Sequence, residues 1–269
     1  AFALRASYLN FRSGDYNTFL IKWVDFYRQS GGFKGLGTSV GNYNLPYLYA
    51  LSLFSYSSIN DLYLIKLLSI TFDVVLAFGM MKLAGVFTRS PARRLGAYLV
   101  TLLLPTVIIN SAKWGQCDSI YVAFAVLALW LIFTDRPKLS MVMMALSFGF
   151  KLQAIFIMPV FLVMFFAKRI KIWDFLVFPA TYLVLILPAV IAGRPVLDAF
   201  TLYYDQAGTV GSGLNYNSPS IFALFRNIEN ASSASAVAVA LAFFFVIAIL
   251  LWTFFRRKNL NNESLLFVS

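Results

Sequence analysis

Long apolar stretches separated by short polar links set the pattern of this chain. The apolar stretches cover residues 62–87, 95–112, 119–134, 173–192 and 234–255. A helix of about 20 residues crosses a hydrocarbon core of roughly 30 Å, so stretches of this kind are typical of membrane-spanning helices. The pattern predicts an all-α fold, a polytopic helical membrane protein with short links between its spans.

The apolar stretch over residues 139–167 needs a different interpretation. A single straight helix here would reverse the orientation of every later segment. Two shorter limbs that meet near Phe150-Lys151-Leu152-Gln153 avoid this reversal. Irregular backbone and a charge at membrane depth persist only where they are buried in protein or line a wet cavity. We therefore expect broken, short helices here, with Lys151 at the junction beside a polar cavity.

Composition agrees with a membrane protein and changes the interpretation of charge. The chain has 269 residues, of which 60% are hydrophobic and 12% charged, with a mean hydropathy of +0.77. A soluble domain of this size cannot bury so much apolar surface. The net charge of +11 comes from Lys and Arg in short links between spans, which is the positive-inside pattern rather than a nucleic-acid surface. We expect no nucleic-acid partner.

The basic clusters predict which segments share a side of the membrane. All clusters should face the cytoplasm; they are Arg89, Arg93 and Arg94; Arg136 and Lys138; Lys168, Arg169 and Lys171; and Arg256, Arg257 and Lys258. Residues 1–61 then form an extracytoplasmic first loop with surface helices, and residues 193–233 form a second outer loop. Residues 62–192 form the helical bundle, and residues 234–269 hold one more helix and the start of a further span. The chain reads as truncated at both ends.

Polar residues that could do chemistry gather on the predicted outer side. This side carries carboxylates that can take a proton or bind sugar hydroxyls, cations that can hold phosphate, and amides that can do either; the candidates are Asp15, Asp118, Asp205, Lys113, Lys151, Arg194, Gln116, Gln153 and Asn217. Mixed charges around one hollow suit an anionic substrate rich in hydroxyls. The chain has no His, and its single Cys117 cannot form an internal disulfide.

The order of several motifs resembles the GT-C superfamily of integral membrane glycosyltransferases. The likeness covers residues 8–230 and is greatest to the bacterial branch related to the GPI and dolichol-dependent mannosyltransferases. It rests on Ser13-Gly-Asp15-Tyr, Asn42-Tyr-Asn-Leu-Pro46-Tyr-Leu-Tyr49, Trp114-Gly-Gln-Cys-Asp118-Ser, and Lys151-Leu-Gln153 before a limb containing Pro159. The first span and the C-terminal spans of the family have no counterpart in this chain.

The resemblance implies an inverting sugar transfer at the extracytoplasmic face of a bacterial cytoplasmic membrane. The donor would be a polyprenyl-phosphate sugar, and the acceptor a hydroxyl of a glycan, lipid or protein. Asp15 matches the first-loop acidic residue of the family, its candidate general base, and Asp118 is a second catalytic candidate. Lys113, Lys151 and Arg194 are candidates for holding the carrier phosphate. We expect no cofactor; a divalent metal is conceivable but not favoured, because the outer loops lack an Asp-X-Asp pair.

Several residues also have a structural interpretation. Asp15 and Asp118 could each cap a helix N-terminus, and Lys151 could pair with a structural carboxylate. Asp205, in an outer loop, could be a solvated surface charge, and Asp73 within a span is expected to bond neighbouring helices. Two other classes remain open at this point: a transporter or flippase of lipid-linked sugars, and a non-catalytic membrane subunit. No internal repeat of the kind typical of transporters is evident.

Overall fold

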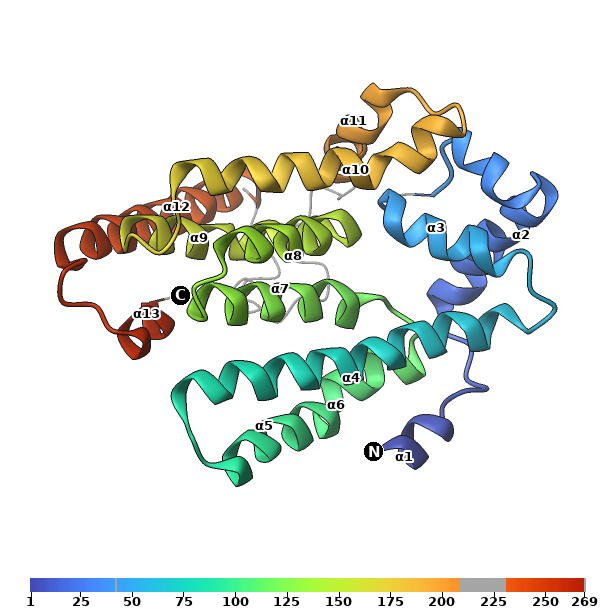
Figure 1. Ribbon diagram of the computed structural model, residues 1–269. Coiled ribbons are helices and arrows are strands. Elements are labelled where there is room, and N and C mark those ends of the chain that lie inside the picture. The colour runs from blue at the N-terminus through green and yellow to red at the C-terminus, as the bar shows by residue number, and fades with distance from the viewer. Residues whose placement is uncertain (42, 209–230, 269) are drawn as a thin grey trace.

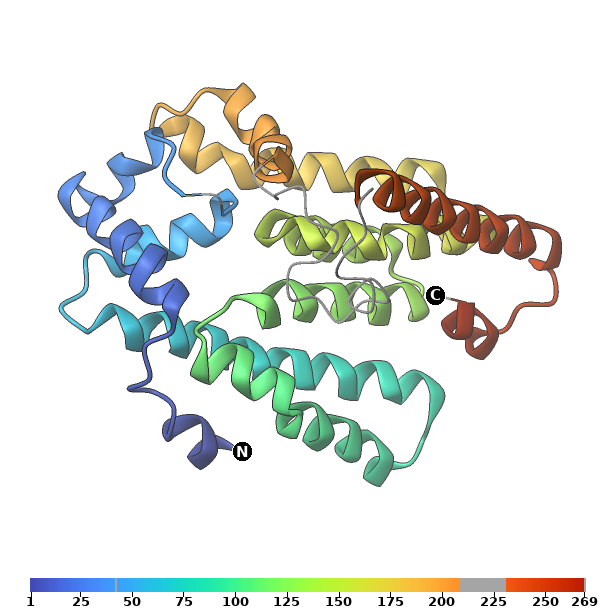
Figure 2. The same cartoon turned by 180° about the vertical axis from the view of Figure 1, so that it is seen from behind.

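The structure is a computed structural model that describes residues 1–41, 43–208 and 231–268. In these ranges every regular element is a helix (Figures 1 and 2). The N-terminal region holds α1 (Phe2–Ala6), η1 (Tyr16–Leu20), α2 (Ile21–Gln29), η2 (Gly32–Gly37) and α3 (Leu45–Phe54). The remainder holds α4 (Asp61–Phe87), α5 (Pro91–Leu103), α6 (Pro105–Ile108), η3 (Ile109–Lys113), α7 (Asp118–Phe133), α8 (Pro137–Phe150), η4 (Leu152–Ile157), α9 (Met158–Phe166), η5 (Ile172–Leu176), α10 (Val177–Ile191), α11 (Val196–Gly208), α12 (Ala231–Arg256) and α13 (Asn262–Val268). The chain is an all-α, polytopic membrane protein, as the apolar pattern predicts.

Three continuous helices of the described region are long and apolar enough to cross a membrane, namely Asp61–Phe87, Ile172–Ile191 and Ser233–Arg256. A fourth candidate is the pair Pro91–Leu103 and Pro105–Lys113, which bends by 47° at its break. The bend is at Pro105, which lacks a backbone N–H and cannot continue a regular helix from the preceding turn. Along α12 the aromatic side chains Phe243, Phe244 and Phe245 are exposed, which suits a helix surrounded by lipid.

The predicted break after Phe150 is confirmed. Helix α8 ends there, and Lys151 has an extended backbone, with φ −154° and ψ 135°, before the chain continues as η4 and α9. Helices α7 and α8, with 16 and 14 residues, reach about 24 and 21 Å, less than a full crossing. They lie in the middle of the bundle, where they pack on each other, on α4 and on α10.

All four basic clusters lie at one end of the bundle, here named the basic end. The α4–α5 link, the start of α8, the link from α9 to α10 and the end of α12 are all on the left in Figure 1 and on the right in Figure 2. Helices α2 and α3 and the end of α10 lie at the opposite end (Figure 1). The threading by basic links therefore matches the arrangement of the helices in space.

The N-terminal region packs closely on the bundle rather than standing apart from it. Val24 of α2 and Leu48 of α3 are fully buried, in one cluster with Ile120 of α7 and Ile186 of α10. This packing brings residues from the start of the chain next to helices that follow much later in the sequence. The site described next depends on this approach.

One sequence-based expectation about the second outer loop is wrong. Asp205 lies in helix α11 rather than in a loop. The helix forms because its apolar side chains recur at helical spacing, so that Ala199 and Leu202 are buried against the bundle. Asn217, predicted in the same loop, lies outside the described residues.

Candidate active site

Asp15 stands at the start of η1 with its carboxylate available for contacts outside the helix. The hydroxyl of Ser13 accepts a hydrogen bond from the backbone N–H of Tyr16 at 3.2 Å. Ser13 therefore caps the start of this helix, and Asp15 makes no capping hydrogen bond. The same Ser13 hydroxyl donates to the carbonyl of Trp114 at 2.8 Å. This bond joins the first loop to the segment that precedes α7 and places Asp15 beside that segment.

Gln116 connects Asp15 to Tyr43. Its amide Nε2 donates to Asp15 Oδ2 at 2.5 Å, and its Oε1 accepts the hydroxyl of Tyr43 at 2.9 Å. Both ends of the amide are engaged, so its orientation is fixed. Burial raises the pKa of Tyr43 above its usual value, and the nearby Asp118 and Asp15 carboxylates act in the same direction. Tyr43 therefore stays protonated and remains a hydrogen-bond donor at neutral pH.

Asp118 and Lys151 form an ion pair at the break between α8 and η4. Lys151 Nζ donates to Asp118 Oδ1, and Asn110 Nδ2 donates to the other oxygen, Oδ2, at 2.6 Å. The side chains are 33% exposed for Asp118 and 18% for Lys151, so the pair is partly accessible. Asp118 begins α7 but makes no capping bond, so its carboxylate serves the pair.

Aromatic rings flank the ammonium group of Lys151. Its Nζ lies 5.9 Å from the ring centroid of Tyr43 and 5.9 Å from that of Tyr121. Rings at this distance attract a cation through their quadrupole. Tyr43 thus contacts both halves of the site: its hydroxyl bonds Gln116, which bonds Asp15, and its ring faces Lys151. The carboxylate of Asp15 and the ammonium of Lys151 belong to one connected group of side chains.

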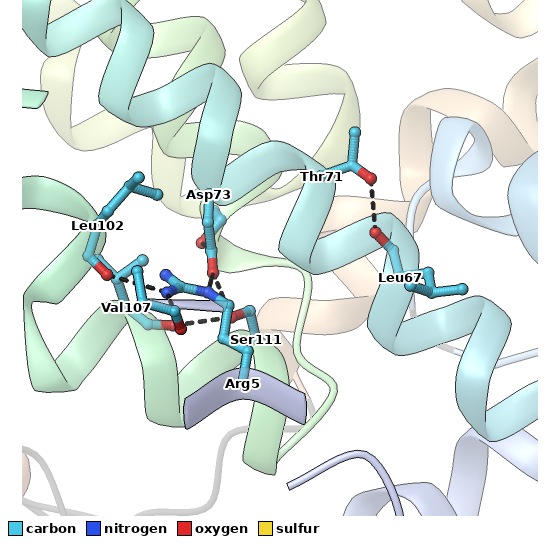
Figure 3. Close-up of polar contacts among 9 residues, drawn as sticks. Arg5, Leu67, Thr71, Asp73, Leu102, Val107 and Ser111 are labelled. Atoms are coloured by element: carbon cyan, nitrogen blue, oxygen red, sulfur yellow. Dashed lines mark hydrogen bonds and ion pairs between the residues drawn. The ribbon is translucent and has the colours of Figure 1, made fainter. Parts of the chain in front are cut away.

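Asp73 of α4 holds the two ends of the segment that carries Gln116 and Asp118. Its Oδ2 accepts the hydroxyl of Ser111 at 2.5 Å (Figure 3). Its Oδ1 accepts the hydroxyl of Ser119, also at 2.5 Å. Arg5 Nε donates to the same Oδ2 at 2.8 Å, and Asp73 is fully buried. The expectation that Asp73 bonds neighbouring helices is confirmed. Because Ser111 and Ser119 directly follow Asn110 and Asp118, this contact also positions the residues of the site.

Other predicted site residues lie outside this group. Lys113 places its charge 5.2 Å from the ring centroid of Phe11 and 5.8 Å from that of Tyr8. Gln153 is exposed on η4, and the structure gives it no hydrogen bond within the described ranges. Arg194 is buried in the link between α10 and α11 and donates to the hydroxyl of Ser39 at 2.9 Å. No described contact joins any of these three side chains to Asp15 or Lys151.

Sequence reasoning missed three members of the site. Tyr43 belongs to the Asn42-Tyr-Asn motif, and Asn110 and Tyr121 lie on either side of Asp118 in the sequence. The available signal is the polar Asn110 near the end of an apolar stretch, because an amide removed from water needs a hydrogen-bond partner. Within the described residues, no three His, Cys, Asp or Glu side chains gather closely enough to hold a metal ion.

The comparison with known families identifies the class of protein. The helical membrane bundle holds a carboxylate and a paired lysine in one polar group. This group lies at the end of the bundle away from the basic links. Such an arrangement suits transfer chemistry at a membrane surface. The sequence profile described as glycosyltransferase family 87 matches residues 43–269, most of the chain. The chain belongs to this family and is a membrane glycosyltransferase. No curated protein and no solved structure matches it significantly.

Proposed function

We propose that the protein is an inverting GT-C type glycosyltransferase that moves a sugar, for which mannose is our first candidate, from a polyprenyl-phosphate carrier to an acceptor hydroxyl. The acceptor is a hydroxyl of a glycan, lipid or protein. The observation that carries the proposal is the connected group Asp15, Gln116, Tyr43, Lys151 and Asp118. It offers a carboxylate and a cation in one place, which are the two groups that a single displacement at a sugar phosphate requires.

Asp15 is the proposed general base. Its Oδ2 accepts Gln116, while Oδ1 has no partner within the described part of the chain. The free oxygen can accept the proton of the attacking hydroxyl as the new glycosidic bond forms. Attack opposite the leaving phosphate inverts the anomeric carbon. The fixed Gln116 amide holds the carboxylate in one orientation, which favours the attack geometry.

Lys151 is the proposed partner of the leaving phosphate. Asp118 and the rings of Tyr43 and Tyr121 hold its ammonium in place, and a fixed cation stabilises the negative charge that grows on the leaving oxygen. Asp118 acts through Lys151 here, because both of its oxygens are already occupied by Lys151 and Asn110. We therefore assign Asp118 as a positioning residue in place of a second base.

An apolar groove near the end of α8 supports a lipid-linked donor. A cavity of about 390 Å³ is lined by apolar and aromatic side chains of α8, α10 and α11, namely Phe148, Phe178, Pro179, Tyr182, Leu183, Phe200 and Tyr203. Phe148 precedes Lys151 by three residues, close to one helical turn. A carrier whose phosphate contacts Lys151 could place its first isoprene units in this groove, where apolar lining favours hydrocarbon over water.

The extracytoplasmic side of a bacterial cytoplasmic membrane is the proposed place of the reaction. The site lies at the end of the bundle away from the basic end. Clusters of Lys and Arg in short links of membrane proteins generally face the cytoplasm, which supports this orientation. The proposed mechanism requires no metal ion, because Lys151 supplies the positive charge at the phosphate. Activity is therefore expected to survive treatment with EDTA.

The donor class can be tested with the purified protein in proteoliposomes. Polyprenyl-phosphate-linked and nucleotide-linked forms of the same labelled sugar are offered with a crude lipid and glycan acceptor fraction. We expect transfer from the lipid-linked sugar only, with inversion of the anomeric configuration as read by NMR of the product. Transfer from the nucleotide sugar, or retention of configuration, would overturn the proposal. Movement of the intact lipid-linked sugar across the bilayer without transfer would favour a flippase instead.

A further inference from the structure

A hollow at the basic end, here named the basic pocket, is separate from the proposed active site. It has a volume of about 440 Å³ and lies between the start of α8 and η5, with Arg136, Lys138, Leu139, Lys171, Trp173 and Asp174 among its lining residues. The active-site residue Lys151 stands at the other end of α8. The glycosyl-transfer mechanism makes no use of the basic pocket.

The cations of the basic pocket lack protein partners. Arg136, Lys138 and Lys171 are exposed, and none of them forms a side-chain hydrogen bond or an ion pair within the described part of the chain. The neighbouring Arg169 differs, because its guanidinium donates hydrogen bonds to Asp135 Oδ1 at 2.9 Å and to Asn262 Oδ1 at 2.7 Å. A hollow with three unpaired cations therefore has a strong positive potential, and a local anion would be attracted to it.

The single carboxylate of the basic pocket does not neutralise this charge. Asp174 is buried, and its Oδ2 accepts the backbone N–H of Lys171 at 2.9 Å, at the start of η5. This bond ties the carboxylate to the backbone, and Asp174 forms no ion pair with the three cations in the described part of the chain. The lining keeps a net positive charge, and its cations remain free to contact a ligand.

Apolar side chains at the rim of the basic pocket indicate that the ligand has a hydrocarbon part. Trp173 is 74% exposed, and Ile172, Leu176 and Leu139 are exposed beside it. Trp is enriched at the level of lipid head groups, where its ring contacts both the acyl region and water. The pocket volume of about 440 Å³ lies within the usual range for a small-molecule site. Cations in a hollow, bordered by apolar side chains at the membrane surface, match an anionic phospholipid in both charge and polarity.

We propose that the basic pocket binds the head-group phosphate of an anionic phospholipid from the leaflet at the basic end. The phosphate contacts Arg136, Lys138 and Lys171, and the acyl chains pass along Trp173 and Leu139. The lipid joins the first turn of α8 to η5 and so holds together two short elements at the end of α8 that lies opposite Lys151. This inference concerns the membrane around the enzyme and does not depend on the identity of the sugar donor.

Native mass spectrometry of the intact protein tests the proposal. The protein is purified in mixed micelles that contain equal amounts of dioleoyl phosphatidylglycerol and dioleoyl phosphatidylcholine, and the bound lipids are counted. We expect the wild type to retain phosphatidylglycerol about tenfold over phosphatidylcholine, because the three unpaired cations attract an anionic head group more strongly than a zwitterionic one. The triple variant Arg136→Gln, Lys138→Gln, Lys171→Gln should lose this preference.

The matched control removes three exposed cations of the same end outside the basic pocket, with Arg89→Gln, Arg93→Gln and Lys258→Gln. This control should keep the wild-type preference. An equal loss in both triple variants would show a diffuse attraction by basic links and would overturn the proposal. Displacement of the lipid by millimolar inorganic phosphate would identify a free phosphate as the ligand, which also contradicts it.

Tryptophan fluorescence gives a second measurement that does not depend on micelle retention. Phosphatidylglycerol with brominated acyl chains quenches a Trp side chain that it contacts. We expect the quenching to fall when Trp173 is replaced by Phe, and to fall equally in the triple variant that lacks the cations of the basic pocket. Unchanged quenching in Trp173→Phe would place the lipid elsewhere and overturn the proposal.

Discussion

Arg5 of α1 and Asp73 of α4 form an ion pair of 2.8 Å between two side chains that are both buried. The pair fixes the first helix of the chain to a membrane-spanning helix. Lys66, two turns earlier on α4, donates to the carbonyls of Tyr8 and Phe11 at 2.6 Å each. The segment that leads to Asp15 is thus held at two points, and these contacts define where the proposed base stands.

Replacement of Asp73 by Asn should destabilise the protein strongly. The change leaves the guanidinium of Arg5 buried without a counter-charge, which typically costs about 3–5 kcal/mol. We expect the apparent Tm in detergent to fall by roughly 6–12 °C. The control is Asp25→Asn, since Asp25 pairs with the exposed Arg28 at 2.6 Å and such pairs contribute about 1 kcal/mol or less. Equal shifts in both variants would contradict the assigned role of Asp73.

Replacement of Ser119 by Ala should reduce turnover more than stability. Ser119 holds Asp73 at 2.5 Å and directly follows Asp118, so its loss shifts the carboxylate that positions Lys151. We expect kcat to fall about tenfold, since small misplacements in an active site are costly. Ser140→Ala is the matched control, because Ser140 is equally buried and donates to the carbonyl of Ala128 at 2.7 Å near the basic end. A similar fall in kcat in this control would show a general structural effect.

Neutralising Lys151 should weaken use of the lipid-linked donor. If Lys151 stabilises the leaving phosphate, Lys151→Gln should lower kcat/KM by about 10²–10³. Asp118→Asn in the Lys151→Gln background should add little, because Asp118 acts through Lys151. Lys113→Gln serves as the comparison, since Lys113 faces the rings of Tyr8 and Phe11 and should change kcat/KM less than about threefold. The reverse ranking of the two lysines would contradict the site.

Cys117 should resist alkylation in the folded protein. The thiol is buried, and this burial, more than any neighbouring charge, raises its pKa to about 12. The thiol of an unfolded Cys has a pKa of about 8.5. Because folding raises the pKa of Cys117 above this value, the thiol stays protonated and almost no thiolate is present at pH 8.5. We expect iodoacetamide to react only after denaturation, as measured by intact mass. Rapid labelling of the folded protein at pH 8.5 would show that the segment before Asp118 is open.

The sequence predicts the broken helix at Lys151 well, because the signals in this segment are strong and local. Basic links on both sides of the 139–167 stretch require the chain to return to the same end, and a charged residue between two apolar limbs marks the turn. The structure has its break at that residue. Physical constraints imposed by the membrane leave few other ways to thread this segment.

The contacts inside the site could not be predicted in the same way. Gln116 bonds Asp15 across 101 residues, and Arg5 bonds Asp73 across 68, so both depend on how the first loop packs on the bundle. Composition and spacing do not contain this information. The same limit explains Lys113: it shares the end of the bundle with Lys151, but side-chain direction turns its charge toward Phe11. The prediction of a loop around Asp205 was wrong because α11 is an amphipathic helix of moderate apolarity. In a sequence with many more strongly apolar spans, such a helix resembles a polar link.

The central claim is that Asp15 removes the proton of the acceptor hydroxyl. The most direct measurement is steady-state transfer by Asp15→Asn with a polyprenyl-phosphate sugar, beside the control Asp25→Asn in helix α2 of the same N-terminal region. We expect Asp15→Asn to lower kcat by about 10²–10⁴ while the protein still binds the donor lipid, as general base catalysis requires, and the control to match the wild type. A wild-type kcat in Asp15→Asn would contradict the account. Loss of donor binding by this variant, with turnover of the bound donor unchanged, would contradict it as well.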